Sequence, residues 1–506
     1  MRLASFGLAF LVASIALAPS TGCTTKFSEA TMAYDAGDFG GASKKADMLC
    51  PTLIIDGDVK GLKVPYDRDR LWIGLEKAKI ASEAGRSDES LAVFGYVDRE
   101  ANDLREIESW YAENPLDSKS WDAGQFAEDI GQAVMGADQT TYLLQPYEMI
   151  LVKTYLCLES LLCGAPGAEA YAKAAADLQQ FEAQDLARAG YQVAQPPVSR
   201  MDGAIRGKVP SGKSTDFSVG GVFSLGQFDA ARQSMRQAID TAKSMRAADP
   251  RVAFSTVVQW AAAIKTRKAE RAVGAARQVA VESGAAALSD ELVRLSGPEG
   301  YKEEWVLVLV DAGRAPERGS FNVRVPIIIP SVGSTVFRAV YPYLKFRADD
   351  RPSFIEVVAD GKPCPAQVLT SIDAVASRNF QRREAELWWV PTVRAAARAV
   401  AAIVAQAAQE DDRTVTKLMI ALGGAVVAEA EQPDLRAWTT LPASQHAAIV
   451  RRPADGVVRV RCASPVGSGE TQVQVPAGAS VVYVRALDAG KHVARVASLW
   501  QASAGK

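Results

Sequence analysis

The hydrophobic pattern of the chain changes near Gly297 and Pro298, and this change constrains the fold more than any other feature. In residues 28–296 the apolar side chains recur at three- and four-residue spacing, which is the period of α-helices. Beyond the break they form short runs rich in Val and Ile, which favour strands. The sequence therefore predicts an α+β protein, with a helical part at residues 23–298 and a β-rich part at residues 299–506.

The helices are expected in pairs joined by short turns, without strands between them. Apolar spacing indicates one helix at residues 71–84, a break at Gly85 and a second helix at residues 91–97. The same pattern recurs at residues 147–162 with 171–178, at 33–42, and at 254–281. These pairs resemble tetratricopeptide repeats, and the resemblance implies a stacked superhelix; an irregular helical bundle is the alternative. Residues 195–226, rich in Gly, Pro and Ser, are expected to form a long loop.

Strands are expected from residue 305 onward. The first run covers residues 305–310, a second covers 323–329, and a third at 354–358 is closed by a turn at Asp360 and Gly361. Further runs occupy residues 448–450, 457–460, 471–475, 480–484 and 492–496. The C-terminal runs resemble a small antiparallel β-sandwich. Together with the earlier runs they predict one β domain that carries a helical insertion at about residues 372–431.

The first residues have the pattern of a secretory signal, since a basic start is followed by an apolar stretch at residues 3–18. That stretch is too short for an ordinary membrane span. Thr21 and Gly22 then stand directly before Cys23, which resembles the lipobox of bacterial lipoproteins. The resemblance implies that residues 1–22 are removed and that Cys23 carries a diacylglycerol and a further acyl chain such as palmitate. An ordinary secreted protein is the alternative.

Two or more acyl chains would hold the protein stably at a membrane. Thr24 follows the anchor where inner-membrane lipoproteins of enteric bacteria carry Asp, so by resemblance we expect the outer membrane, with the body facing the periplasm. Retention at the inner membrane and exposure at the cell surface stay open.

A second resemblance covers most of the chain. The segment 431–442, together with Tyr147, Glu148 and residues 305–316, resembles a poorly characterised group of bacterial lipoproteins that pair tetratricopeptide-like helices with a C-terminal β domain. The group has no assigned catalytic residues, so the resemblance supplies none. Asp434 and Arg436 are expected to form a buried ion pair beside Trp438 that fixes the crossing from helix to strand.

The composition argues against several classes of function. The chain has 57 basic and 59 acidic residues, so no broad positive surface is expected to bind nucleic acid. The two histidines, His446 and His492, lack metal-ligand or catalytic-triad spacing. Five cysteines remain beyond Cys23, so at least one stays unpaired. Cys157 and Cys163 are expected to be buried as small hydrophobic residues.

One motif suggests a nucleotide, because Gly207, Gly212, Lys213 and Ser214 match the phosphate-binding loop of ATPases letter for letter. Asp311, which follows an apolar run, would even match the acidic residue that completes such a site. The flanking residues lack the preceding buried strand and the following helix that the loop requires, and the periplasm maintains no ATP pool. We therefore expect neither a nucleotide nor any other cofactor or metal.

Two further segments are apolar enough to suggest contacts. Residues 395–408 and 418–428 are too short to span a bilayer and are expected either to touch a membrane or to form a core helix hairpin. Residues 325–330 are expected to form a docking surface or to pack against the helical part.

The leading hypothesis from the sequence is a membrane-anchored, non-enzymatic scaffold or adaptor that binds envelope proteins through its helices. One alternative is a ligand-binding or enzymatic site in the cleft between the helical and β-rich parts. Another is a membrane-active, self-assembling component that uses the apolar segments near Ile328 and Ile403.

Overall fold

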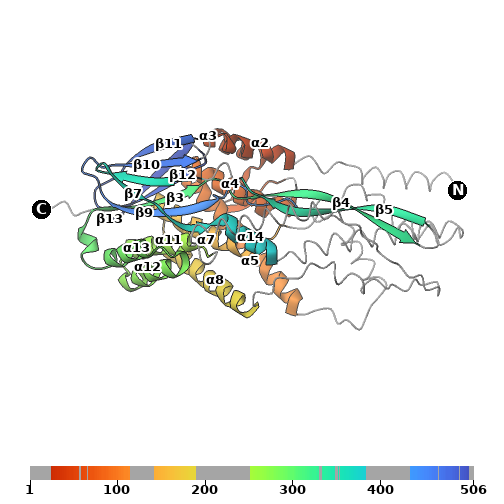
Figure 1. Cartoon of the computed structure of the whole chain (residues 1–506), viewed down its shortest axis with the longest axis horizontal. Coiled ribbons are helices and arrows are strands. Elements are labelled where there is room, and N and C mark those ends of the chain that lie inside the picture. The colour runs from red at the N-terminus through yellow and green to blue at the C-terminus, as the bar shows by residue number, and fades with distance from the viewer. Residues whose placement is uncertain are drawn as a thin grey trace.

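The computed structural model describes residues 24–113, 142–189, 251–382 and 434–500, apart from a few positions inside these ranges. It is a mixed α+β structure in which the helices of the first half pack against the sheets of the second half (Figure 1). The predicted α+β class is therefore confirmed. The predictions for Cys23, for the loop at 195–226 and for the apolar segments at 395–408 and 418–428 concern residues outside the described ranges.

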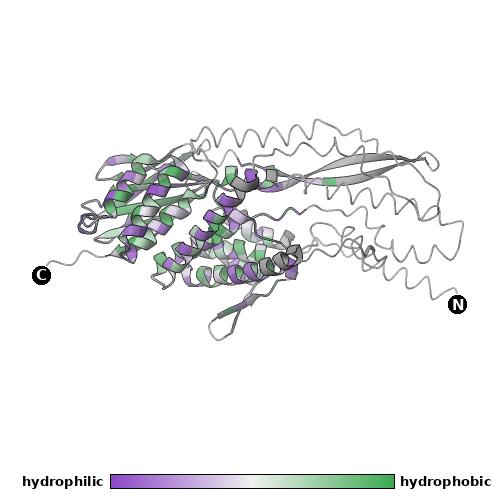
Figure 2. Ribbon diagram, turned by 90° about the horizontal axis from the view of Figure 1, so that it is seen from below, coloured by the Kyte–Doolittle hydropathy of each residue, from purple (hydrophilic) through white to green (hydrophobic). Residues whose placement is uncertain are grey.

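The described helices of the first part form hairpins, and each hairpin packs against the next described one. The predicted helix pairs are confirmed. Hydrophobic and hydrophilic residues alternate in patches along these helices, as amphipathic packing requires (Figure 2). The helices are α2 (Thr24–Asp35), α3 (Phe39–Leu49), α4 (Arg70–Glu83), α5 (Ser87–Glu113), α7 (Pro146–Cys163), α8 (Ala168–Ala189), α11 (Ala253–Lys265), α12 (Ala269–Ser283) and α13 (Ala286–Leu295), with short 3₁₀ turns at Asp67–Asp69 and Gly300–Lys302.

Local sequence explains where these helices begin and end. Helix α7 begins with a capping box, in which Glu148 accepts a hydrogen bond from the backbone N–H of Gln145, and Pro146 occupies the first turn. The helix ends at Gly164, whose φ of 73° is a left-handed conformation that favours glycine. Gly85, which separates α4 from α5, has a φ of 78° for the same reason.

The expectation that the first part lacks strands is wrong at one place. A short antiparallel hairpin, β1 (Thr52–Ile55) with β2 (Asp58–Leu62), follows α3. Leu53, Ile54 and Ile55 form an apolar run with two β-branched isoleucines. The run ends before Asp56 and Gly57, which is the usual sequence signal of a hairpin turn. The signal was present in the sequence but too short to outweigh the helical pattern around it.

The β-rich part contains a five-stranded and a four-stranded sheet. The strand order of the first is β13-β12-β3-β9-β8 and that of the second is β11-β10-β6-β7. The strands are β3 (Trp305–Ala312), β6 (Phe354–Ala359), β7 (Lys362–Pro365), β8 (Gln367–Ser371), β9 (Ser444–Arg451), β10 (Val457–Ser464), β11 (Gly467–Gln474), β12 (Ala479–Ala486) and β13 (His492–Trp500). The expected strands are present. Among the C-terminal strands, β10 pairs antiparallel with β11 and β12 with β13, as expected. Strand β12 also runs parallel to β3, with Val482 opposite Val308, which the sequence did not predict.

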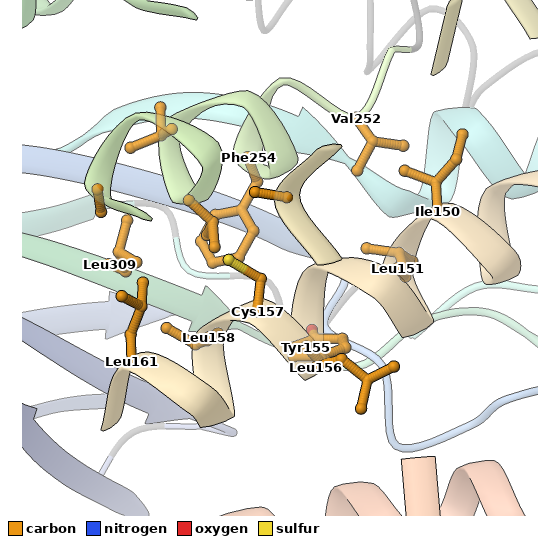
Figure 3. Close-up of a cluster of buried hydrophobic side chains, with 14 of the residues drawn as sticks. Ile150, Leu151, Tyr155, Leu156, Cys157, Leu158, Leu161, Val252, Phe254 and Leu309 are labelled. Carbon is orange, nitrogen blue, oxygen red and sulfur yellow. The ribbon is translucent and has the colours of Figure 1, made fainter. Parts of the chain in front are cut away.

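Strand β3 is buried on both of its faces, which explains its continuous apolar sequence. Val306, Val308 and Val310 belong to the core between the two sheets. Leu307 and Leu309 belong to the larger core shared with the helices. In Figure 3, Leu309 lies beside Leu158 and Leu161 of α7, with Phe254 of α11 close by. The five-stranded sheet is thus the central layer between the helices and the second sheet.

The hairpin of β4 (Glu317–Ile329) and β5 (Gly333–Lys345) forms a two-stranded sheet of its own. Its strands extend away from the body toward the same end as the first turn of α2 (Figure 1). Residues 323–329 therefore join neither of the two main sheets. A strand that enters no larger sheet shows the same local alternation as one that does, so the sequence pattern could not distinguish them.

Helix α14 (Ile372–Arg382) follows β8 and begins the helical stretch predicted at residues 372–431, whose remainder is not described. Within the described ranges, no helix combines the length and the apolar character needed to cross a bilayer.

The contact between β3 and the helices gives a first prediction. Leu309 is fully buried, so Leu309→Ala should lower the free energy of unfolding by about 2–5 kcal/mol, because it removes apolar contacts and leaves a cavity. The control Leu435→Ala, at a residue that is 42% exposed, should change it by less than about 1 kcal/mol. Chemical denaturation measures both, and equal losses would contradict the central position of β3.

Candidate functional site

A cavity of about 660 Å³ lies in the helical part, between α8, α11 and α12. Its volume falls in the range of protein sites that bind small molecules or short peptide segments. Small residues face it from three helices, namely Ala172 and Ala176 of α8, Ala262 and Ala263 of α11, and Gly274 and Ala275 of α12. Because these side chains are short, the helix backbones leave a hollow between them. We call this hollow the helical groove.

Amide side chains form one wall of the helical groove. Gln259 donates a hydrogen bond to the side-chain oxygen of Gln179 at 2.8 Å, and so links α11 to α8. Gln179 donates in turn to the backbone oxygen of Val252 at 3.0 Å. These bonds hold two amide groups at the edge of the hollow. Amides both donate and accept hydrogen bonds, so they can pair with the backbone of a bound segment.

Two glutamates mark the opposite sides of the helical groove. Glu282 of α12 is buried and accepts hydrogen bonds from Thr256 at 2.6 Å and from Gln278 at 3.1 Å. Glu169 of α8 is contacted by Lys268 and Arg271, and the hydrogen bond from Lys268 lowers the pKa of its carboxyl. Glu169 therefore stays ionised and joins α8 to the α11–α12 turn.

The charges that line the helical groove balance one another, as three glutamates face one lysine and two arginines. These charged residues are Glu169, Glu182, Glu282, Lys173, Arg251 and Arg271. A balanced lining with an apolar floor fits a segment of polypeptide better than a polyanion. No group of histidine, cysteine or acidic side chains suited to hold a metal ion occurs in the described part of the chain.

A second polar cluster lies where the helices meet the five-stranded sheet. The ammonium group of Lys79 on α4 is 2.8 Å from the carboxylate of Asp311 on β3. Both side chains are fully buried. Asp311 also accepts hydrogen bonds from Tyr155 of α7 at 2.7 Å and from Tyr483 of β12 at 2.8 Å. We call this cluster the interface clamp.

The interface clamp contains a second pair of buried charges, which balances its total charge at zero. Arg485 of β12 lies 3.3 Å from Glu83 of α4, and Glu83 is also 3.0 Å from Lys79. Arg485 donates a further hydrogen bond to the hydroxyl of Tyr34 on α2 at 2.9 Å. Five elements, namely α2, α4, α7, β3 and β12, therefore meet at one set of buried charges.

The pKa shifts in the interface clamp follow from this geometry. Burial would raise the pKa of Asp311, but the charges of Lys79 and Arg485 and the hydrogen bonds from Lys79 and Tyr155 together outweigh burial and lower it. Burial and the nearby carboxylates raise the pKa of Tyr155 and Tyr483 well above the usual value, so both stay protonated and donate. Asp311 is the acidic residue that would have completed a nucleotide site. Its carboxylate is instead bound by Lys79, Tyr155 and Tyr483.

Another buried ion pair joins α7 to the last strand. Glu159 of α7 accepts two hydrogen bonds from Arg495 of β13, both at 2.8 Å, which is the bidentate geometry that arginine favours. Ser82 of α4 donates to the same carboxylate at 2.5 Å. The helical hairpins are therefore fixed to the sheet at several separate points.

The segment before β9 is held by a carboxylate that sequence analysis missed. Glu76 of α4 is buried and accepts hydrogen bonds from the backbone N–H groups of Thr439 at 2.6 Å and Thr440 at 3.1 Å. Burial raises the pKa of Glu76 to about 7, although these hydrogen bonds act in the opposite direction. A glutamate inside an amphipathic helix pattern gives no signal that distinguishes it from an exposed one.

The structure describes some of the residues predicted as sites and not others. Asp434 and Arg436 form an ion pair at 2.8 Å, and Arg436 also contacts Asp69 at 2.9 Å. The ring above the guanidinium is that of Tyr142, with Trp438 packed on other aromatic residues instead. Cys23 and the four residues of the nucleotide motif, Gly207, Gly212, Lys213 and Ser214, lie outside the described ranges.

The described cysteines differ in exposure, and the buried ring of His446 lies 2.8 Å from the hydroxyl of Ser444. Cys157 is buried as expected, whereas the expectation for Cys163 is wrong, because it lies exposed at the last turn of α7. Cys157, Cys163, Cys364 and Cys462 have free thiols. Burial lowers the pKa of His446 to about 4, so this residue is neutral near pH 7.

Comparison of the chain with protein-family models, with curated proteins and with solved structures finds no match.

The interface clamp predicts a large penalty for removing one of its charges. Lys79→Met leaves the carboxylates of Asp311 and Glu83 with a single cation, so the free energy of unfolding should fall by about 3–5 kcal/mol. The matched control Lys302→Met, at an exposed lysine paired with Glu299, should change it by less than about 1 kcal/mol. The double variant Lys79→Met with Asp311→Asn should lose less than the sum of the two single variants, and additive losses in this cycle would show that the two charges act independently.

Glu76 predicts a dependence of stability on pH. Its pKa is raised in the folded state, so the folded protein keeps this proton at pH values where the unfolded chain has lost it. The free energy of unfolding should therefore fall as pH rises from about 4.5 to about 7, by up to about 3 kcal/mol. Denaturation at several pH values, compared between the native chain and Glu76→Gln, measures this contribution. An unchanged pH profile in Glu76→Gln would exclude Glu76 as its source.

Proposed function

We propose that this protein is a membrane-anchored, non-enzymatic adaptor that holds a segment of a partner protein in the helical groove. The observation that carries the proposal is the groove itself, a hollow of about 660 Å³ with a floor of small residues and walls of amides and balanced charges. Such a lining supplies shape and hydrogen bonds without an aligned nucleophile and base. Its chemistry is that of recognition.

The arrangement of the helices supports this proposal. Hairpins that stack in sequence order are the basis of tetratricopeptide-like superhelices, whose inner surfaces bind extended or helical segments. We infer that α2 to α13 form a degenerate array of this kind, and that the two facing sheets form a sandwich-like support. The interface clamp then fixes the array to the sheet, so that a bound partner meets a preformed surface.

The membrane anchor is part of the proposal. The lipobox-like residues Thr21 and Gly22 precede Cys23, and helix α2 begins at the next residue, Thr24. Acylated Cys23 would therefore tether the folded body to the membrane by a very short connection. We infer an outer-membrane lipoprotein that faces the periplasm, whose partners are envelope proteins.

The alternative of a ligand site between the helical and β-rich parts has less support. The polar groups at that boundary, Lys79, Asp311 and Arg485, are fully buried and saturate one another. Access to them would require the helices to separate from the sheet.

The proposal is tested by filling the helical groove without disturbing the fold. Gly274 of α12 has open space where a side chain would begin, so Gly274→Phe should place a large ring in the groove. Gly40 of α3 also has open space but lies away from the groove, so Gly40→Phe is the matched control. The full lipidated chain, carrying a photo-crosslinking residue at the groove residue Lys173, is irradiated in cells.

We expect discrete envelope proteins to crosslink at Lys173, with at least a tenfold loss in Gly274→Phe and no loss in Gly40→Phe. Equal crosslinking in both variants would contradict binding in the groove. A Cys23→Ala chain that still sediments with membranes would contradict the lipid anchor separately.

A further inference from the structure

Apolar and polar residues alternate along the β4–β5 hairpin, although the hairpin pairs with neither of the main sheets. Cross-strand register places residues of odd number opposite one another on one face, as for Val325 with Phe337 and Val323 with Ala339. Residues of even number share the other face, where Arg324 is opposite Arg338 and Ile328 opposite Ser334. From Phe321 to the end of β4 the odd face is apolar, while the even face carries most of the polar residues.

The base of the hairpin is fixed to the body of the protein. Tyr341 and Leu344 are buried, and Glu317 forms ion pairs with Lys345 at 2.7 Å and Arg347 at 2.9 Å. Arg347 and Arg314 both pair with Asp35 at the end of α2, at 3.4 and 2.9 Å. The hairpin therefore leaves the body at a defined point, next to the last turn of α2.

The part beyond this base has the length of a membrane segment. Each strand has 13 residues and so spans about 43 Å. The seven residue pairs beyond the base, from Val323 with Ala339 outward, cover about 23 Å. The apolar band of a transmembrane β-barrel is about 25 Å tall, and its strands alternate between a lipid-facing apolar residue and a polar residue facing the interior.

The position of the hairpin also points to the membrane. Helix α2 runs from Thr24 to Asp35, so it spans about 18 Å, and its first turn lies toward the end to which the hairpin extends (Figure 1). Thr24 adjoins the proposed lipid anchor at Cys23. The strands are longer than α2, so a membrane reached by the acyl chains lies within reach of the distal hairpin.

We propose that the distal part of the β4–β5 hairpin inserts into the lipid bilayer, with hairpins of several copies pairing edge to edge into a β-barrel. A single hairpin leaves two strand edges without backbone partners, which a bilayer does not tolerate, so insertion requires several copies. The odd face contacts lipid, and the even face lines a water-filled interior. Arg324 and Arg338 are paired in register on this even face. Pro326 removes one backbone donor from this ladder.

This inference rests on the membrane anchor of the proposed function but does not depend on the helical groove.

The full lipidated chain is the protein tested, in a Cys163→Ser and Cys364→Ser background, because the other described cysteines are buried. Single cysteines are introduced on the odd face by Val325→Cys or Phe337→Cys and on the even face by Arg324→Cys or Val336→Cys. Each carries a fluorophore whose emission rises in an apolar environment, and vesicles of phosphatidylethanolamine and phosphatidylglycerol are added. Met48→Cys, at an exposed residue of the body, is the control.

Insertion predicts that vesicles raise the emission several-fold at both odd positions and leave the even positions and Met48→Cys unchanged. Crosslinked oligomers should appear with vesicles and be lost in Val325→Lys. Equal responses on both faces, no response on either, or the same pattern without vesicles would overturn the inference. If the protein sediments with the vesicles but the emission does not alternate between the two faces, the result supports the lipid anchor and contradicts insertion of the hairpin. The two proposals can therefore be tested separately.

Discussion

The buried pairing of Lys79 with Asp311 is the interaction on which the arrangement of the two parts depends. Removing two charges from water is unfavourable unless each finds a close partner and its remaining hydrogen bonds are satisfied. Here two tyrosine hydroxyls and the second pair, Glu83 with Arg485, complete the set. Each of these partners requires α4, α7 and the central sheet to occupy their observed positions together. Misplaced docking would leave a charge buried and unpaired.

The central sheet can take this role because β3 and β12 each have two buried faces. Alternation along β3 sends Val306, Val308 and Val310 toward the second sheet, and it sends Leu307, Leu309 and Asp311 toward the helices. One strand therefore contributes both to the apolar core and to the clamp. The helical groove lies on hairpins that this sheet supports, and the β4–β5 hairpin follows directly from β3. Both proposed surfaces are thus connected to the central sheet.

The sequence predicted the elements better than their connections. Helix pairs around Gly85 and Gly164 and the strand at residues 305–310 could be read from local period and turn residues, because those signals act within a few residues. The parallel pairing of β3 with β12 and the separation of β4 and β5 from the main sheets depend on contacts between distant residues. The sequence did not distinguish three buried charges on the helices from exposed ones, because their partners are distant in the sequence. These charges are Lys79, Glu76 and Glu159. The groove consists of alanines and amides, which carry no chemical motif.

Amide hydrogen exchange resolved along the native chain, with increasing denaturant, tests most directly whether the clamp joins the two parts into one unit. The slowest amides of α4 and of β3 should exchange with the same opening free energy and the same denaturant dependence, because Lys79 and Asp311 separate only when both elements unfold. Exchange of α4 at a clearly lower opening free energy, with β3 still protected, would show that the helices detach while the sheet stays folded, and would contradict a fixed support for the groove.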